Sequence, residues 1–377
     1  MNNQNLKKIL LILGTRPEAI KMAPLFKELK KSTLLEQRIL VTAQHRQMLD
    51  SVLEVFQIRP DYDLNLMRAD QGLTDLTSKL LLGCRDILGE WKPDLALVHG
   101  DTTTSMAGAL AAFYQRIPVG HVEAGLRTFD IYSPYPEELN RQITSRIAKY
   151  HFCPTKLSLE NLIREGVEPE NAIVTGNTVI DALFNGLRLL DDPNSSGVHT
   201  GYSKTDRPYI LITGHRRENF GEGFQNICEA IRELAERYLH FDFVYPVHLN
   251  PNVQSPVQKI LSHTSNVKLL PPQDYLPFIS LMRDSFLILT DSGGIQEEAP
   301  SLGKPVLVMR STTERPEALS AGTVRLVGSS KLNIVDEVSS LIESPRAREA
   351  MLNAVNPYGD GQAAERIRAF IEGRLCF

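Results

Sequence analysis

Residues 286–298 have the sequence FLILTDSGGIQEE, an apolar run followed by two glycines and the start of a helical pattern. This order is typical of a strand–turn–helix unit that binds an anion. The glycines let the backbone approach the ligand closely, and the new helix presents free N–H groups. A carboxylate one helical turn later suits hydroxyl groups better than phosphate. The stretch therefore suggests a nucleotide whose diphosphate and ribose are bound together, and a plain sharp turn is an alternative of about equal weight.

Apolar runs alternate with helical patterns over most of the chain. Five runs in the first half predict strands that are buried on both faces: Ile9–Leu13, Ile39–Thr42, Leu95–Val98, Val119–Val122 and Ile173–Thr175. Six more follow in the second half: Tyr209–Thr213, Phe241–Val247, Val267–Leu270, Phe286–Thr290, Val306–Met309 and Val324–Val327. Two such series predict an α/β protein with two Rossmann-like, doubly wound parallel-sheet domains. Ligands of such sheets bind at the carboxyl ends of strands, so we expect the site in a cleft between the domains.

The expected domain boundary lies near Gly176-Asn177-Thr178. We therefore predict an N-terminal domain over residues 1–175 and a C-terminal, nucleotide-binding domain over residues 176–360. A strong turn signal at 356–361 precedes the helical pattern Gln362–Arg374, which we expect to cross back onto the first domain, so residues 361–377 are assigned there. The polar stretch 191–206 is expected to be an exposed loop.

Length and composition indicate a two-domain globular protein. The chain has 377 residues, 42% of them hydrophobic and 23% charged. The net charge of −4 argues against a general nucleic-acid binder. The apolar run after Lys7 and Lys8 is too short for a signal peptide, and no segment reaches membrane-spanning length. The four cysteines lack the spacing of a metal site or a disulfide framework, so we expect a cytoplasmic protein without membrane attachment.

Polar residues follow two of the predicted strands, Ile9–Leu13 and Leu95–Val98. Thr15 is expected to cap the helix after the first strand, with Pro17 in its first turn. Arg16 would then point into the cleft and could clamp a phosphate. Asp101 follows Leu95–Val98, where it could cap the next helix or take part in catalysis.

Carboxylates follow the next strand. Glu123 ends the strand Val119–Val122, and a buried carboxylate is costly unless it is paired or functional. His121, inside that strand, is expected to be a satisfied core histidine. Glu137 and Arg141 share a helix face at a spacing of four residues, for which a surface ion pair is an equally weighted interpretation.

The second half offers cations at its strand ends. The segment GHRREN at residues 214–219 follows Tyr209–Thr213, and His215 within it can donate a proton near neutral pH. Arg315 follows Val306–Met309 and is expected to reach the same cleft. The glycine fingerprint Gly-x-Gly-x-x-Gly does not follow the first strand, and the phosphate-binding pattern Gly-x₄-Gly-Lys-Ser/Thr is missing from the chain. We therefore expect no nicotinamide, no other cofactor and no metal.

Taken together, six segments resemble the non-hydrolysing UDP-N-acetylglucosamine 2-epimerases of bacteria. They are GTRPEAIK (14–21), HGDTT (99–103), HVEAGLR (121–127), PEE (136–138), GHRREN (214–219) and DSGGIQEE (291–298). The likeness extends over essentially the whole chain. It implies a GT-B-like pair of Rossmann-type domains, a homodimer, and reversible conversion of UDP-GlcNAc to UDP-ManNAc without nicotinamide. It also implies a product used for bacterial surface polysaccharide.

The resemblance also implies roles for individual residues. The catalytic motif positions are matched by Asp101, Glu123, Glu137 and His215. The substrate-binding positions are matched by Arg16, Lys21, Arg141, Ser292, Gly293, Gly294, Glu298 and Arg315, with Glu298 at the position of the ribose ligand. In some relatives a second UDP-GlcNAc acts as an activator, and part of that site resembles Gln44, His45 and Gln47. Some of those relatives carry a basic residue where this chain has Asp70.

The chemistry of this conversion explains the residue types. The C2 proton of the sugar is not acidic, because it has no neighbouring carbonyl. If the C1–O bond to UDP breaks first, positive charge on the ring acidifies C2–H, and a carboxylate can remove the proton to give 2-acetamidoglucal and UDP. Proton return to the other face and re-addition of UDP complete the epimerisation. Two other classes remain open: a GT-B glycosyltransferase, and a non-catalytic sugar-nucleotide sensor, against which the set of carboxylates argues.

Overall fold

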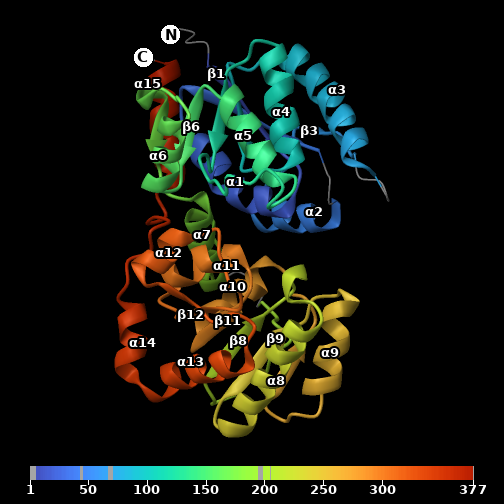
Figure 1. The fold of residues 1–377 in the computed structure, drawn as a ribbon. Coiled ribbons are helices and arrows are strands. Elements are labelled where there is room, and N and C mark those ends of the chain that lie inside the picture. The colour runs from blue at the N-terminus through green and yellow to red at the C-terminus, as the bar shows by residue number, and fades with distance from the viewer. Residues whose placement is uncertain (1–5, 43–45, 67–70, 194–197, 204, 377) are drawn as a thin grey trace. The chain divides into compact units, whose positions relative to one another are not determined.

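The computed structural model describes residues 6–42, 46–66, 71–193, 198–203 and 205–376 (Figure 1). The chain forms two compact units. Unit 1 comprises Met1–Asn185 and Tyr358–Phe377, and unit 2 comprises Gly186–Pro357. The predicted boundary at residues 175 and 176 precedes helix α7 (Thr178–Asp191), whereas the units divide inside that helix.

Unit 1 contains a fully parallel seven-stranded sheet in the order β3-β2-β1-β4-β5-β6-β7. Its strands are β1 (Lys7–Leu13), β2 (Leu35–Val41), β3 (Tyr62–Asp63), β4 (Leu95–His99), β5 (Val119–Val122), β6 (Tyr150–Cys153) and β7 (Ala172–Val174). The five runs predicted from the sequence all form strands. The pattern missed β3, which has two residues, and β6, whose fully buried sequence YHFC is too polar and too short to stand out.

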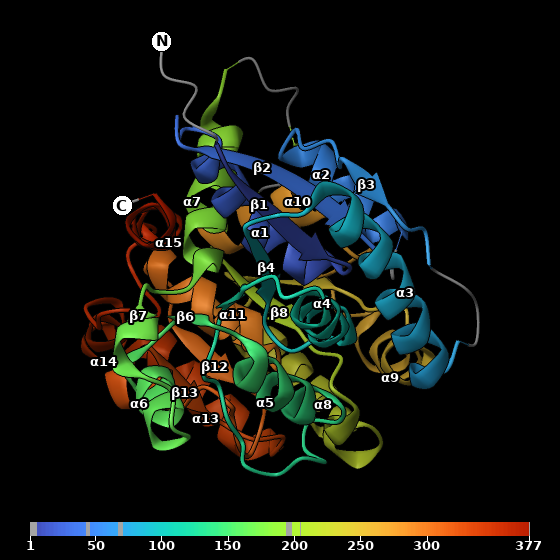
Figure 2. The same cartoon turned by 90° about the horizontal axis from the view of Figure 1, so that it is seen from above.

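Eight α-helices accompany this sheet in the described part of unit 1: α1 (Arg16–Leu29), α2 (Arg46–Val55), α3 (Leu73–Trp91), α4 (Thr103–Tyr114), α5 (Glu137–Ile147), α6 (Lys156–Arg164), α7 and α15 (Ala363–Leu375). Helices α3 and α4 lie side by side (Figures 1 and 2). Helix α15 packs against α1, where Arg368 pairs with Glu28 at 3.1 Å. Its Phe370 ring meets Tyr150 and Phe152 edge-on, each at 5.6 Å between centroids.

Unit 2 contains a fully parallel six-stranded sheet in the order β10-β9-β8-β11-β12-β13. Its strands are β8 (Tyr209–Thr213), β9 (Asp242–Pro246), β10 (Val267–Leu270), β11 (Leu287–Thr290), β12 (Val306–Val308) and β13 (Val324–Leu326), all at the predicted runs. Its helices are α8 (Glu222–Arg237), α9 (Pro251–Leu261), α10 (Tyr275–Asp284), α11 (Gly293–Glu298), α12 (Pro316–Ala321), α13 (Lys331–Glu343) and α14 (Pro345–Leu352). The prediction of two Rossmann-like parallel sheets is confirmed.

The strand order places the polar segments at one kind of position in both sheets. In unit 1 the order reverses between β1 and β4, and in unit 2 it reverses between β8 and β11. Loops at the carboxyl ends of such neighbouring strands run in opposite directions and leave a crevice that binds ligands. The segments GTRPE and HGDTT follow β1 and β4, and GHRREN and DSGG follow β8 and β11. Each unit therefore presents its polar motifs at the position where this fold binds ligands.

Across the ranges that the structure describes, no helix is both long and apolar enough to cross a membrane.

Candidate active site

Glu123 lies at the carboxyl end of β5 in a strained backbone conformation. Its φ of 62° falls in the left-handed region, which is uncommon for a residue other than glycine and often marks a functional position. Lys21 Nζ from α1 forms an ion pair with Glu123 Oε2, and Asn177 Nδ2 donates to the same oxygen at 2.7 Å. Side-chain exposures of 8% for Glu123 and 12% for Lys21 shield this pair from solvent, which strengthens it.

Asp101 lies in the neighbouring loop, after β4, and is held by α5. Arg141 donates to Asp101 Oδ2 at 2.6 Å, and Asn140 Nδ2 donates to the Asp101 carbonyl at 3.0 Å. Of the two interpretations given for Asp101, helix capping is wrong, because the N-cap of α4 is Thr102, whose side chain accepts from Ser105 N at 3.0 Å. The Asp101 carboxylate is therefore not used in helix capping.

The electrostatic surroundings of Asp101 include the other two predicted catalytic carboxylates, Glu123 and Glu137. Burial raises the pKa of Asp101, Arg141 lowers it, and the charges of Glu123 and Glu137 raise it further. Glu137 is the first residue of α5. The i, i+4 ion pair considered for Glu137 and Arg141 is not the pairing found, since Arg141 contacts Asp101 and Glu138, the latter at 3.4 Å. Unit 1 thus gathers several carboxylates and two cations, an arrangement suited to acid/base chemistry.

Two buried histidines flank this cluster. Burial lowers the pKa of His99 to about 4, and His99 Nε2 lies 3.9 Å from Glu123 Oε2. Burial lowers the pKa of His121 to about 3, and its Nε2 contacts the Gly100 carbonyl at 2.7 Å. His121 is a core histidine as predicted, but it is only half satisfied, because its buried Nδ1 has no hydrogen-bond partner in the described structure. Both rings are neutral at pH 7, so Lys21 and Arg141 carry the positive charge beside the carboxylates.

Glu18 holds the loops after β1 and β4 together. Its Oε2 accepts from Gly14 N at 3.0 Å and from both the N and Oγ1 of Thr15 at 2.8 Å, completing a capping box. Its Oε1 accepts from Thr102 Oγ1 at 2.6 Å and Ser105 Oγ at 2.9 Å. The carboxylate is 1% exposed. The predicted cap at Thr15 is confirmed, and Arg16 follows it as the first residue of α1.

We expect Glu18→Ala to destabilise unit 1 by about 3 kcal/mol, because it leaves several buried donors without an acceptor. Calorimetric unfolding of the purified variant measures the change. Glu36→Ala is the matched control, since the Glu36 side chain is 38% exposed and pairs only with Arg38 in the described structure, so its loss should cost less than about 0.5 kcal/mol. Equal unfolding temperatures for the two variants would contradict the structural role of Glu18.

In unit 2, Asp291 at the end of β11 organises the loop after β8. Asp291 Oδ2 accepts from the backbone N of His215 and of Arg216, each at 2.8 Å. His215 Nδ1 lies 3.6 Å from Asp291 Oδ1, and its ring stacks on His248 with centroids 5.3 Å apart. Partial burial lowers the pKa of His215, Asp291 raises it, and His248 and Arg216 lower it.

Two guanidinium groups gather at the glycine turn of α11. A methyl group on Gly293 would lie 3.7 Å from Arg216 and 3.8 Å from Arg315, so the glycine leaves room beside both cations. Ser292 is the N-cap of α11, which confirms the predicted strand–turn–helix unit. Arg315 pairs with the buried Glu297, a partner that the sequence analysis did not assign. The turn therefore combines the N-terminal end of a helix with two nearby guanidinium groups, features that favour an anion.

Glu298 is the last residue of α11. Its carboxylate oxygen would lie 3.9 Å from a methyl group on Gly294, and the residue is 9% exposed. A carboxylate at this position, one turn into α11, suits hydroxyl groups better than phosphate, and the role of Glu298 as ribose ligand stays a prediction.

A pocket of 410 Å³ opens next to this turn region, within the size of small-molecule sites, roughly 300–1,000 Å³. Its lining residues all belong to unit 2: His215, Arg216, Arg217, Glu218, His248 and Asn250. His248 and Asn250 come from the polar end of β9. The pocket is dominated by cationic and imidazole groups, which favours an anionic ligand.

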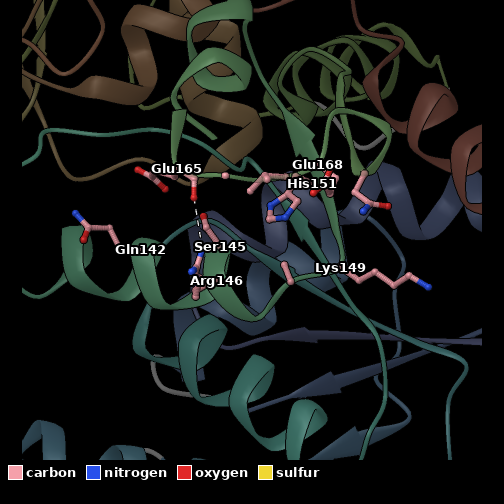
Figure 3. A pocket seen from close by; sticks show the side chains of 11 residues that line it. Gln142, Ser145, Arg146, Lys149, His151, Glu165 and Glu168 are labelled. Carbon is pink, nitrogen blue, oxygen red and sulfur yellow. Dashed lines mark hydrogen bonds between the residues drawn. The ribbon is translucent and has the colours of Figure 1, made fainter. Parts of the chain in front are cut away.

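A second pocket, of 240 Å³, lies in unit 1 (Figure 3). It is lined by the end of α5 and by the segments that precede β6 and β7, including Arg146, Lys149, His151, Glu165 and Glu168. This is the amino-terminal edge of the sheet, opposite the edge that carries Glu123. The predicted site residues are not among its lining residues.

The possible activator site falls mainly outside the described residues. Gln44, His45 and Asp70 lie outside the described residues. Gln47 lies in α2, and its side chain is likewise outside the described structure.

These two sets of polar motifs define a class of protein: a two-unit α/β protein with paired carboxylates and cations in one unit and a pocket rich in cationic and imidazole groups in the other. The family model for UDP-N-acetylglucosamine 2-epimerases matches residues 27–372. The chain belongs to this enzyme family. The fold is also found in a glycosyltransferase of kitacinnamycin, which is 10% identical with a TM-score of 0.65 over 98% of this chain and 100% of that one.

Individual relatives are similar over nearly their whole length. The UDP-N-acetylglucosamine 2-epimerase of Escherichia coli K12 is 58% identical over 364 residues, which are 96% of this chain and 97% of that protein. The crystal structure of UDP-GlcNAc 2-epimerase from Neisseria meningitidis, bound to UDP-GlcNAc, is 52% identical with a TM-score of 0.89. That comparison covers 98% of this chain and 100% of the Neisseria chain.

Proposed function

We propose that this protein interconverts UDP-GlcNAc and UDP-ManNAc by eliminating UDP to a 2-acetamidoglucal and adding it back. The observation that carries the proposal is the cluster around Glu123: a strained, buried carboxylate held by Lys21 and Asn177, with Asp101 within electrostatic reach. An enzyme that only transfers the sugar to an acceptor has no need of acid/base groups around C2. The acidic groups of unit 1 would act on the sugar, and the cations of unit 2 would bind UDP.

In the first step the C1–O bond breaks and its electron pair leaves with the diphosphate. The departing group gains negative charge, which Arg216, Arg315 and a protonated His215 would stabilise. The free N–H groups at the start of α11 add to this stabilisation. Because these donors are fixed before the reaction, they need little reorganisation as the charge develops.

In the second step a carboxylate of unit 1 takes the C2 proton, and the C–H electron pair forms the C1–C2 double bond. Return of a proton to the opposite face of C2, with attack of UDP oxygen on C1, gives the epimer. Asp101, Glu123 and Glu137 are the groups proposed for the two faces. Lys21 and Arg141, paired with Glu123 and Asp101, would set their protonation states and orientation.

The proposal extends to assembly and biological role. A homodimer is supported by exposed apolar residues on adjacent helices, Leu82 on α3 and Phe113 and Tyr114 on α4, with exposures of 54%, 57% and 69%. Exposed aromatic groups of this size favour burial against a partner. The enzyme would work in the cytoplasm, and its UDP-ManNAc would supply bacterial surface polysaccharide.

The test of this function is incubation of the purified protein with UDP-GlcNAc as the only sugar compound, followed by NMR of the anomeric protons. We expect UDP-ManNAc to appear until the two epimers reach equilibrium. A glycosyltransferase would leave UDP-GlcNAc unchanged without an acceptor, and a sensor would bind it without turnover. Either of those results would contradict the proposed function.

We expect Glu298→Ala to weaken UDP binding by roughly 1.5–3 kcal/mol, the loss of hydrogen bonds from ribose hydroxyls to a charged acceptor. Calorimetric titration with UDP measures the change. Glu337→Ala is a suitable control in the same unit, because its side chain is 40% exposed and pairs with Arg325. Unchanged UDP affinity of the Glu298 variant would exclude Glu298 as the ribose ligand.

A further inference from the structure

Asp291 has two carboxylate oxygens in different environments. Oδ2 is satisfied by the backbone N–H groups of His215 and Arg216 and lies 3.4 Å from Asn219 Nδ2. Oδ1 is buried and, within the described structure, has no hydrogen-bond partner. The residue as a whole is 0% exposed. A buried carboxylate oxygen without a donor is costly, so a nearby group that can supply a proton is significant.

The His215 ring is a group close to that oxygen with a proton to offer. Its Nδ1 lies 3.6 Å from Oδ1, a few tenths of an ångström beyond an ordinary hydrogen bond of roughly 2.7–3.2 Å. The His215 side chain is 42% exposed, and a small rotation of its ring would close the gap. A proton on Nδ1 would satisfy Oδ1, whereas a proton on Nε2 alone would leave two acceptors facing each other.

We propose that Asp291 is a positioning residue that keeps a proton on Nδ1 of His215 and favours the charged form of its ring. The second ring nitrogen, Nε2, is then the atom left for the ligand. It donates when the ring is protonated and can pass that proton to the departing diphosphate. This inference rests on the proposed function, because it gives His215 its state before the C1–O bond breaks. The same logic orients histidines beside carboxylates in hydrolases and metal sites.

The other charges around His215 explain why such a partner is needed. The stacked His248 ring and Arg216 both disfavour a second positive charge, and Arg217 lines the same pocket. His248 Nδ1 accepts from Asn250 N at 3.1 Å, which leaves its own proton on Nε2. Among the described residues, the anion paired with the ring is Asp291, and Glu218 lines the same pocket. Without the Asp291 charge, His215 would lose its proton at lower pH.

The variant Asp291→Asn tests this inference. An asparagine can still accept the backbone N–H groups, but its amide N–H₂ would face Nδ1 and move the histidine proton to Nε2. We expect kcat to fall roughly 10–100-fold, the usual effect of removing an orienting partner, with a smaller change in UDP affinity. The alkaline limb of the kcat profile should move to lower pH. An unchanged kcat and pH profile would overturn the proposal.

A double-mutant cycle separates positioning of His215 from general support of the loop. If Asp291 acts through His215, Asp291→Asn should add little loss of kcat in a His215→Asn background. The same fold loss in both backgrounds would overturn the proposal. Asn219→Ala is the matched control, because Asn219 contacts Oδ2 and the Met309 carbonyl but not the histidine ring. It should leave the alkaline limb in place.

Nitrogen NMR of the His215 ring gives a reading that does not need turnover. In the neutral form of the wild-type protein with UDP bound, we expect the proton on Nδ1, and in Asp291→Asn on Nε2. A wild-type ring with its proton on Nε2 would overturn the inference even if the enzyme epimerises UDP-GlcNAc. A protein that carries the predicted tautomer but does not turn over would instead contradict the proposed function.

Discussion

Glu123→Gln is expected to lower kcat by about 10²–10⁴-fold, because an amide cannot accept the C2 proton. The substitution keeps the size of the side chain, and Asn177 retains an oxygen to which it can donate. Lys21 would lose the carboxylate with which it pairs. UDP affinity should change little, since Glu123 is not among the proposed UDP ligands, which are Arg16 and groups of unit 2. Steady-state kinetics with UDP-GlcNAc and calorimetric titration with UDP measure the two effects.

Glu165→Gln is the control for this experiment. Glu165 is also a carboxylate of unit 1, but it pairs with Arg127 at 2.7 Å at the opposite edge of the sheet, in the pocket of Figure 3. The kcat of the Glu165→Gln variant should remain close to that of the wild type. Near wild-type turnover of Glu123→Gln would remove Glu123 from the mechanism, and the strained backbone at that position would then need another explanation.

His215→Asn is expected to lower kcat by about 10²–10⁴-fold, because asparagine keeps a donor but carries no charge and transfers no proton. UDP binding should change much less if the stabilisation is realised mainly in the transition state. The effect should also follow the charge of the ring: burial, His248 and Arg216 lower the pKa of His215, so its protonated form is lost as the pH rises. Wild-type kcat should therefore fall on the alkaline side, and the variant should lack that limb.

The exposed His263, which follows α9, provides a control, because the same histidine-to-asparagine substitution is made there outside the proposed site. His263→Asn should retain the wild-type kcat and pH profile. If His215→Asn also turned over normally, Arg216, Arg315 and the α11 turn would remain as the stabilisers of the leaving group, and the role of Asp291 would fall with that of His215.

The regular parts of the fold follow from local patterns. Strands buried on both faces must be apolar along their whole length, so runs such as Leu95–Val98 and Tyr209–Thr213 were recognisable without any long-range information. The apolar pattern missed strand β6 because His151 and Cys153 interrupt its apolar character. His151 is buried as a neutral ring, since burial lowers its pKa to about 4, and the sequence alone does not reveal that state.

The site was recognisable as a set of motifs but not as a set of contacts. The helix cap at Thr15 depends on neighbours in sequence and was predicted, whereas the second half of its capping box, Glu18, was not. The partners of Arg141 depend on how α5 packs beside the loop after β4. The helical spacing suggested Glu137, but in the structure Arg141 pairs with Asp101 and Glu138. Asn177 was visible only as part of a domain joint, because its contact with Glu123 spans 54 positions in the chain.

The measurement that tests the central claim most directly is deuterium incorporation at C2 during turnover in deuterated water. Elimination and re-addition pass the C2 proton to a carboxylate that exchanges with solvent. We therefore predict that UDP-ManNAc formed from UDP-GlcNAc carries deuterium at C2, detected by mass spectrometry and by loss of the C2 proton signal in NMR. Epimerisation with the original C2 proton fully retained in both sugar nucleotides would contradict the account.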